Sequence, residues 1–328
     1  MKKSMWLFMF TLIMSTMITL SSNNWMSMWM GLEINMMSFV PMILNKPYKM
    51  KSEAAMIYFL VQSMSSIPLI MMIMINMCNY LIYTSVINMT VMICLFTKMG
   101  VAPFHMWMPE ILTKMSWKKG IMLMTWQKMA PMMMMSNLNN MSNIMNTSII
   151  MCVIIGSIGG INQTSLRKMM GYSSINHLGW MMAINKSMNK WMIYFIIYSI
   201  MIMMTCYMFM NYKMYSMNQI SSINMNYIEK INMMFLMLSM GGLPPFIGFL
   251  PKWITIQYMI NQKELIMIFI MIMFSLITLM YYSRVMINMI ISSSTTMKWK
   301  INTLNKSMMI VIMFINMSLP MMMILNMI

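Results

Sequence analysis

Four charged side chains stand inside long apolar stretches of this sequence: Glu33, Lys98, Lys128 and Lys252. A charge at the centre of a bilayer costs about 2.5–3.5 kcal/mol on insertion scales, so four of them cost on the order of 10 kcal/mol. That sum is comparable to the whole stability of an ordinary domain. Charges kept at such a cost usually serve the movement of protons or ions, and we take all four as candidate sites.

Burial makes these groups suitable for handling protons. Desolvation lowers the pKa of a lysine by up to about 3–5 units, and a nearby carboxylate raises it again. We therefore expect Glu33 to be the partner of Lys98. His177 and His105, also in apolar surroundings, are candidate relays because histidine titrates near neutral pH. A structural hydrogen bond to a neighbouring helix is the alternative for His177, and His105 lies within the first Gly–Pro cluster.

The composition supports a membrane protein without a cofactor of its own. Of the 328 residues, 60% are hydrophobic and 8% are charged, whereas soluble proteins carry about 25% charged residues. The net charge is +17, but the lysines are scattered through short loops, which argues against nucleic acid. The four cysteines show no C-x-x-C spacing, and the two histidines lie far apart. We expect no iron–sulfur cluster, haem or other metal site.

Hydropathy predicts an all-α polytopic protein with eleven transmembrane helices. A helix needs about 20 apolar residues to cross the hydrocarbon layer. The predicted segments are 4–21, 25–44, 53–75, 80–113, 119–136, 146–162, 168–185, 191–210, 229–262, 264–290 and 306–327. With this count, sixteen of the 22 Lys and Arg residues lie in loops on one side, three on the other and three within the membrane. The positive-inside rule then puts the N-terminus on the positive side and the C-terminus on the opposite side.

Two of these segments, 80–113 and 229–262, are too long for one straight crossing. Each has about 34 residues, which as one helix would extend about 50 Å. Each also contains a Gly–Pro cluster in which Gly, Pro, Phe and Pro recur at an offset of 142 residues. Proline breaks a helix, and paired broken helices are typical of transporters built from inverted repeats. Two unrelated proline kinks are the alternative interpretation.

The repeat hypothesis divides the chain into two inverted five-helix units. The first covers 1–136 with its broken helix at 80–113, the second covers 146–290 with its broken helix at 229–262, and a last helix follows at 306–327. Glu110 and Lys114 have the spacing of an ion pair on one helix face. Gly156 and Gly160 are spaced to let helices approach closely.

Five stretches of the sequence resemble a known family: GLEINMMSF, KMGVAPFHMWMPE, TWQKMAP, LRKMMGYSSINHLGWM and LSMGGLPPFIGFLPKW. They resemble subunit 2 of animal mitochondrial NADH–ubiquinone oxidoreductase (respiratory complex I), a family of antiporter-like subunits. The resemblance covers about residues 25–260.

The resemblance implies proton translocation across the mitochondrial inner membrane, coupled to electron transfer from NADH to ubiquinone in other subunits. The positive side would then be the matrix, so the N-terminus would face the matrix and the C-terminus the intermembrane space. The partners would be other membrane and accessory subunits of complex I, together with phospholipids such as cardiolipin. The glutamate and lysines of the family's proton path match Glu33, Lys98, Lys128 and Lys252.

Two other kinds of protein compete with this interpretation. An autonomous secondary cation/proton antiporter would also need broken helices and buried lysines, so the residues alone do not separate it from a complex I subunit. A structural membrane scaffold would leave the intramembrane charges without a purpose.

Overall fold

The computed structural model describes residues 3–44, 48–78, 83–138, 142–291, 299–300 and 306–320, most of them helical. The chain divides into two compact units. Unit 1 comprises Met1–Cys152 with Asn185–Met188, and unit 2 comprises Val153–Ile184 with Asn189–Ile328.

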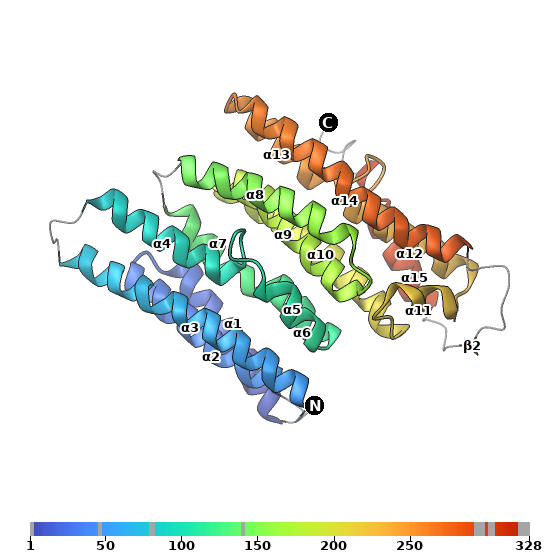
Figure 1. Cartoon of the computed structure of the whole chain (residues 1–328), viewed down its shortest axis with the longest axis horizontal. Helices are drawn as coiled ribbons and strands as arrows, with labels where there is room; N and C mark the ends of the chain where they lie inside the picture. Colours follow the sequence, from blue (N-terminus) through green and yellow to red (C-terminus); the bar gives the residue numbers. More distant parts are fainter. Residues whose placement is uncertain are drawn as a thin grey trace. The chain divides into compact units, whose positions relative to one another are not determined.

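Unit 1 is a bundle of helices in which α7 occupies a central position. Its helices are α1 (Lys3–Ser21), α2 (Trp25–Ile43), α3 (Lys49–Met77), α4 (Thr84–Met99), α5 (Trp107–Lys114), α6 (Trp117–Met124), α7 (Trp126–Ser136) and the first half of α8 (Ser142–Ile161). Neighbours in sequence pack together from α1 to α4, and α7 contacts α1, α2 and α4 (Figure 1). The helices that carry Glu33 and Lys98 therefore both touch the helix that carries Lys128.

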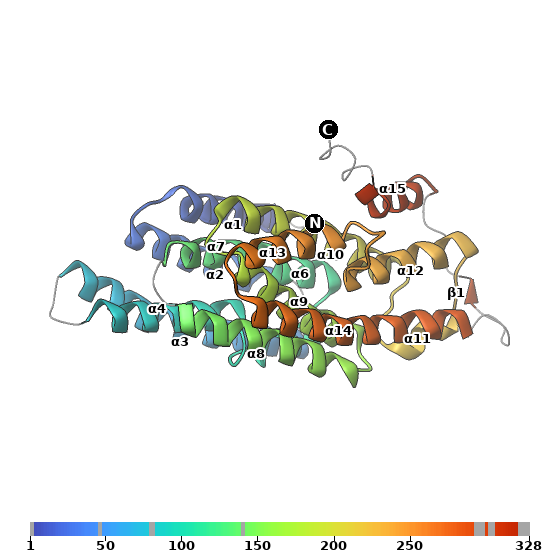
Figure 2. The same cartoon turned by 90° about the horizontal axis from the view of Figure 1, so that it is seen from above.

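Unit 2 is a second helical bundle, organised around α14. It contains the rest of α8, then α9 (Leu166–Ala183), α10 (Met188–Asn211), α11 (Met217–Ser222), α12 (Tyr227–Gly241), α13 (Phe249–Asn261), α14 (Leu265–Ile291) and α15 (Lys306–Asn316). α14 packs against α11, α12 and α13, and α13 also contacts α9 (Figure 2). One short parallel pair, β1 (Ile223–Asn224) with β2 (Trp299–Lys300), departs from the predicted all-α pattern.

The two predicted helix breaks are present, and they share one geometry. α4 ends at Met99, and the next residue, Gly100, has a φ of 73°. α12 ends at Gly241, and Gly242 has a φ of 77°. Glycine adopts this left-handed conformation at little cost, and it is the usual residue after a helix C-terminus. The prolines that follow cannot donate backbone hydrogen bonds, so the chain resumes a helix only at α5 and α13.

A third interruption was not predicted. The sequence suggested one helix over 119–136, but α6 ends at Met124 and α7 begins at Trp126. Between them, the hydroxyl of Thr125 donates to the carbonyl of Ile121 at 2.7 Å. Threonine bonding of this kind bends helices, and Pro131 in α7 removes a further donor from the helical ladder. The helix that carries Lys128 is thus interrupted three residues before it.

Four helices of the described residues are each long and apolar enough to cross a membrane: Lys49–Met77, Asn143–Ile161, Met188–Asn211 and Leu265–Ile290. Three shorter apolar helices accompany them. The count of eleven crossings and the division into two five-helix repeats therefore stay predictions. The last predicted helix, 306–327, is observed as α15 up to Asn316, and residues 321–327 lie outside the described part.

The close helix packing predicted for Gly156 and Gly160 is confirmed. A Cβ atom on Gly156 would lie 2.6 Å from the backbone nitrogen of Asn176 in α9. A Cβ atom on Gly160 would lie 2.7 Å from the ring of Tyr281 in α14. Both glycines of α8 therefore let neighbouring elements of unit 2 approach closely.

Candidate functional site

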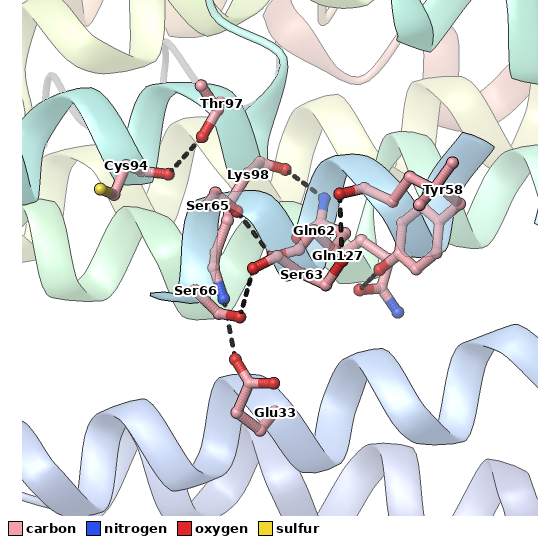
Figure 3. Close-up of polar contacts among 11 residues, drawn as sticks. Glu33, Tyr58, Gln62, Ser63, Ser65, Ser66, Cys94, Thr97, Lys98 and Gln127 are labelled. Atoms are coloured by element: carbon pink, nitrogen blue, oxygen red, sulfur yellow. Dashed lines mark hydrogen bonds and ion pairs between the residues drawn. The ribbon is translucent and has the colours of Figure 1, made fainter. Parts of the chain in front are cut away.

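The predicted partnership of Glu33 and Lys98 is present in unit 1. The Lys98 Nζ lies 3.3 Å from the Glu33 Oε1, with the lysine side chain 2% exposed and the glutamate side chain 21% exposed (Figure 3). Lys98 lies in the last turn of α4, where the negative end of the helix dipole favours a cation. A buried lysine thus faces a partly accessible carboxylate at the end of a broken helix.

Beside this pair, a chain of hydrogen bonds joins three helices. The hydroxyl of Tyr58 in α3 donates to the Gln127 Oε1 at 3.0 Å. The Gln127 Nε2 donates in turn to the Asn35 Oδ1 in α2 at 2.9 Å. Asn35 lies two residues after Glu33, and Gln127 immediately precedes Lys128. This chain therefore ties the backbone that carries Lys128 to the backbone that carries Glu33.

Lys128 is enclosed by unit 1, with 2% of the residue exposed. Its backbone N–H donates to the carbonyl of Thr125 at 3.0 Å, across the interruption between α6 and α7. The Cys152 thiol in α8 is within electrostatic range of its ammonium group. The predicted intramembrane position of Lys128 is thus matched by a buried position in the bundle.

Side chains also hold the backbone at the first break. The Gln62 Nε2 in α3 donates to the carbonyl oxygen of Lys98 at 3.0 Å. The backbone N–H of Ala102 donates to the Cys152 Sγ at 3.2 Å. His105 lies within the same break, with its Nδ1 3.1 Å from the carbonyl oxygen of Pro103. This contact is local to the break, and a relay role for His105 stays a prediction.

The predicted ion pair between Glu110 and Lys114 is confirmed, with its atoms 2.8 Å apart. A second carboxylate, Glu53 in α3, lies 3.5 Å from the same ammonium. Hydrogen bonding to Glu110, with a smaller contribution from Glu53, raises the pKa of Lys114. All three residues lie toward the surface of unit 1, so this cluster links α5 to α3 outside the buried site.

In unit 2, Lys252 binds the end of the broken helix directly. Its Nζ donates to the carbonyl oxygen of Gly241, the last residue of α12, at 2.7 Å, and the residue is 4% exposed. The ring centre of Trp180 lies 5.7 Å from the same ammonium, within the range of a cation–π interaction. A Cβ atom on Gly242 would lie 2.8 Å from the end of the Lys252 side chain. Glycine at this position thus provides both the backbone turn and the space for the lysine.

His177, one turn before Trp180 on α9, belongs to the same region of unit 2. Its Nδ1 lies 2.8 Å from the hydroxyl of Tyr194, and its ring centre is 4.9 Å from that of Tyr198. These side chains border a cavity of about 10 Å³ that Pro251 also lines, which is room for about one water molecule. The Tyr194 contact matches the structural alternative for His177, a hydrogen bond to a neighbouring helix, and a relay role stays a prediction.

Sequence reasoning found the charged residues and missed the amides that hold them. Gln62, Gln127, Asn35 and Cys152 were not singled out. A polar residue at helical spacing inside an apolar segment is the signal that could have identified them, since buried amides need partners. The signal is clearest for Asn35, which is two residues from Glu33, and for Gln127, which precedes Lys128.

The family described as "NADH:quinone oxidoreductase/Mrp antiporter, TM" matches residues 22–278 of this chain. NADH-ubiquinone oxidoreductase chain 2 of Locusta migratoria is 43% identical over 298 residues, which cover 89% of this chain and 87% of that protein. The chain belongs to the NADH-ubiquinone oxidoreductase chain 2 family. The corresponding protein of Anopheles gambiae is 41% identical and covers 92% of this chain and 91% of its own length.

Solved structures carry the same fold at low sequence identity. A chain of respiratory complex I from Thermus thermophilus with bound aureothin matches with a TM-score of 0.83 and 14% identity, over 94% of this chain and 75% of that chain. A chain of the Mrp complex from Dietzia sp. DQ12-45-1b matches with a TM-score of 0.76 and 12% identity, over 85% of this chain and 59% of that chain. The helical, polytopic architecture predicted from the sequence is thereby confirmed.

Proposed function

We propose that this chain is the antiporter-like, proton-translocating chain 2 subunit of a mitochondrial respiratory complex I. It takes no part in redox chemistry itself, and other subunits transfer electrons from NADH to ubiquinone. Membership of the family supports the assignment to the complex. The observation that supports proton transfer is the buried ion pair of Lys98 and Glu33 at the end of a broken helix.

In this proposal Glu33, Lys98, Lys128 and Lys252 carry the protons, with His177 and His105 as candidate relays. The four charged residues would line one hydrated path at mid-depth of the membrane. Lys128 holds the central proton, and the charges on its neighbours set its affinity. A change of two to three pKa units corresponds to about 2.7–4 kcal/mol. Moving one charge against the membrane potential costs about 2.3 kcal/mol per 100 mV. Changes of two to three pKa units are therefore large enough to drive a proton against this potential.

The hydrogen bonds of each unit support a role for these residues in storing and releasing protons. The carboxylate of Glu33 favours the charged form of Lys98, and moving this carboxylate away would favour release of the Lys98 proton. The Gly241 carbonyl likewise favours the charged form of Lys252, because a hydrogen bond from a charged donor is about twice as strong as a neutral one. Small movements of either helix break would therefore change proton affinity.

We place the chain in the mitochondrial inner membrane as a multi-pass protein. The excess of basic loops on one side supports an N-terminus in the matrix and a C-terminus in the intermembrane space. The partners are the other membrane and accessory subunits of complex I. The basic matrix loops would also attract anionic phospholipids, cardiolipin among them.

Substitution of Lys128 tests the proposal. Lys128→Met should impair coupled turnover and proton pumping in the assembled complex, while NADH oxidation by an artificial acceptor stays intact. Lys128→Arg should not rescue pumping, because arginine keeps its proton throughout this pH range. Pumping at the normal number of protons per electron in Lys128→Met would assign Lys128 a structural role, and the path would have to run elsewhere.

An autonomous cation/proton antiporter is the second candidate, and the description of the matching family, which names the Mrp antiporter beside NADH:quinone oxidoreductase, is the observation in its favour. Migration on a native gel separates the two. A complex I subunit should migrate in a very large assembly with NADH dehydrogenase activity. An autonomous antiporter should migrate separately from that activity and exchange cations for protons in vesicles that contain it alone.

A further inference from the structure

The first helix break removes the backbone hydrogen bond between Ala102 and Lys98, among others, and side chains replace this bond at both ends. In a continuous helix the Ala102 N–H would donate to the Lys98 carbonyl, four residues earlier. Here the backbone N–H of Gly100 donates to the carbonyl of Thr97 at 3.3 Å, and that of Val101 donates to the carbonyl of Phe96 at 2.9 Å.

The two groups of the lost bond take separate partners. The Lys98 carbonyl accepts from the Gln62 Nε2 at 3.0 Å, and the Ala102 N–H donates to the Cys152 Sγ at 3.2 Å. A buried carbonyl without a donor is costly, so the amide of Gln62 meets a need that the break creates.

The second break meets a similar need differently. There the lysine itself donates, from the Lys252 Nζ to the Gly241 carbonyl at 2.7 Å. The carbonyl that each break exposes thus accepts from a side chain of another helix, Gln62 of α3 at the first break and Lys252 of α13 at the second, and this bond anchors the end of the broken helix. Lys98 is bonded to the carboxylate of Glu33, while the amide of Gln62 occupies the carbonyl (Figure 3).

We propose that Gln62 is a positioning residue that occupies the Lys98 carbonyl at the break and so keeps the Lys98 ammonium paired with Glu33. This inference rests on the proposed function, because it assumes that Lys98 carries protons. Gln62 is 6% exposed on α3, which packs against both α2 and α4. Its amide does not titrate, so its hold on the carbonyl stays constant as protons arrive and leave.

Removing the amide should release the ammonium from its carboxylate. In Gln62→Met the Lys98 carbonyl loses its donor, and the end of α4 loses this anchor on α3, so the Lys98 side chain is no longer held opposite Glu33. The titratable groups that act on Lys98 are Glu33 from α2 and Cys94, one turn earlier on α4. With the Glu33 contact weakened, Lys98 should lose its proton at lower pH than in the normal protein.

The experiment compares Gln62→Met with Ser65→Ala in assembled complex I in inner-membrane vesicles. Ser65 lies on the same helix, is 5% exposed and donates only within α3, to the Gln62 carbonyl at 2.8 Å. We expect coupled turnover to fall about three- to tenfold in Gln62→Met, the worth of one neutral hydrogen bond. The pH profile of pumping should move by about one unit toward lower pH. Ser65→Ala should change neither.

Further variants separate the ways in which the proposal can fail. If Gln62→Met pumps normally with an unchanged pH profile while Lys98→Met abolishes pumping, the positioning role of Gln62 is overturned and the proposed function stands. Normal pumping in Lys98→Met overturns the proposed function. If Gln62→Met does not assemble, Gln62→Leu, which also removes the donor and adds no charge, should show the same loss. Failure of both to assemble assigns Gln62 to folding and overturns the proposal.

Discussion

Replacing Glu33 by glutamine removes one charge from the buried pair and keeps the shape of the side chain. At the observed separation of 3.3 Å, two unit charges attract each other by about 5 kcal/mol at an effective dielectric constant of about 20. Because the Glu33 side chain is 21% exposed, solvent screens part of this attraction. We take about 3–5 kcal/mol as the loss, which is the usual cost of breaking a buried pair.

That loss is similar in size to the free energy needed to move one proton against the membrane potential. One charge moved against about 180 mV costs about 4 kcal/mol. A loss of about 3 kcal/mol lowers the proton affinity of Lys98 on the order of 100-fold. Glu33→Gln should therefore abolish pumping or reduce it at least about tenfold, whereas NADH oxidation by an artificial acceptor should be unaffected, since no redox group depends on Glu33.

The assay is dye-monitored acidification in inner-membrane vesicles, driven by NADH and a short-chain quinone, with electron transfer measured in parallel. Glu53→Gln is the matched control, because Glu53 faces Lys114 at 3.5 Å with its side chain 46% exposed, and such exposed pairs contribute about 0–1 kcal/mol. A normal number of protons per electron in Glu33→Gln would refute the reasoning, because the carboxylate would then not control the Lys98 proton.

Three further outcomes are expected. Gly242→Ala should destabilise the second break and reduce pumping. The φ of Gly242 is 77°, and the new methyl group would lie 2.8 Å from the Lys252 side chain. Pumping and assembly at normal levels would contradict this prediction. Gly156→Ala should lower the yield of assembled complex on native gels by forcing α8 away from Asn176, 2.6 Å from the added atom. An N-terminal tag should resist protease added outside intact mitoplasts and a C-terminal tag should be digested, so digestion of the N-terminal tag would refute the eleven-span topology.

The helix breaks could be predicted because glycine and proline act through the backbone alone. Gly100 and Gly242 fix a left-handed turn whatever surrounds them, so the Gly–Pro clusters identified both breaks. The interruption at Thr125 was missed because threonine is compatible with a helix. Only its hydroxyl contact with the Ile121 carbonyl distinguishes it, and that contact depends on a rotamer that the sequence does not specify.

The charged residues of the site could be predicted because an intramembrane charge is costly in any fold. Their partners depend on which helices meet. Glu33 was correctly paired with Lys98 because few carboxylates were available, and only five Glu residues exist in the chain. The amide of Gln62 had many equivalent candidates. Its contact with the Lys98 carbonyl follows from the packing of α3 on α4, which no local pattern specifies.

The bond between Lys252 and Gly241 also has a mechanical consequence. α12 and α13 are joined both by the chain through residues 242–248 and by this side-chain bond. An ammonium donates a stronger hydrogen bond than a neutral amine, so the stiffness of the second connection depends on the proton that Lys252 carries. Loss of the proton loosens one of two parallel connections, and the angle between the helices can then change. A chemical event at one nitrogen atom would thus become a displacement of whole helices.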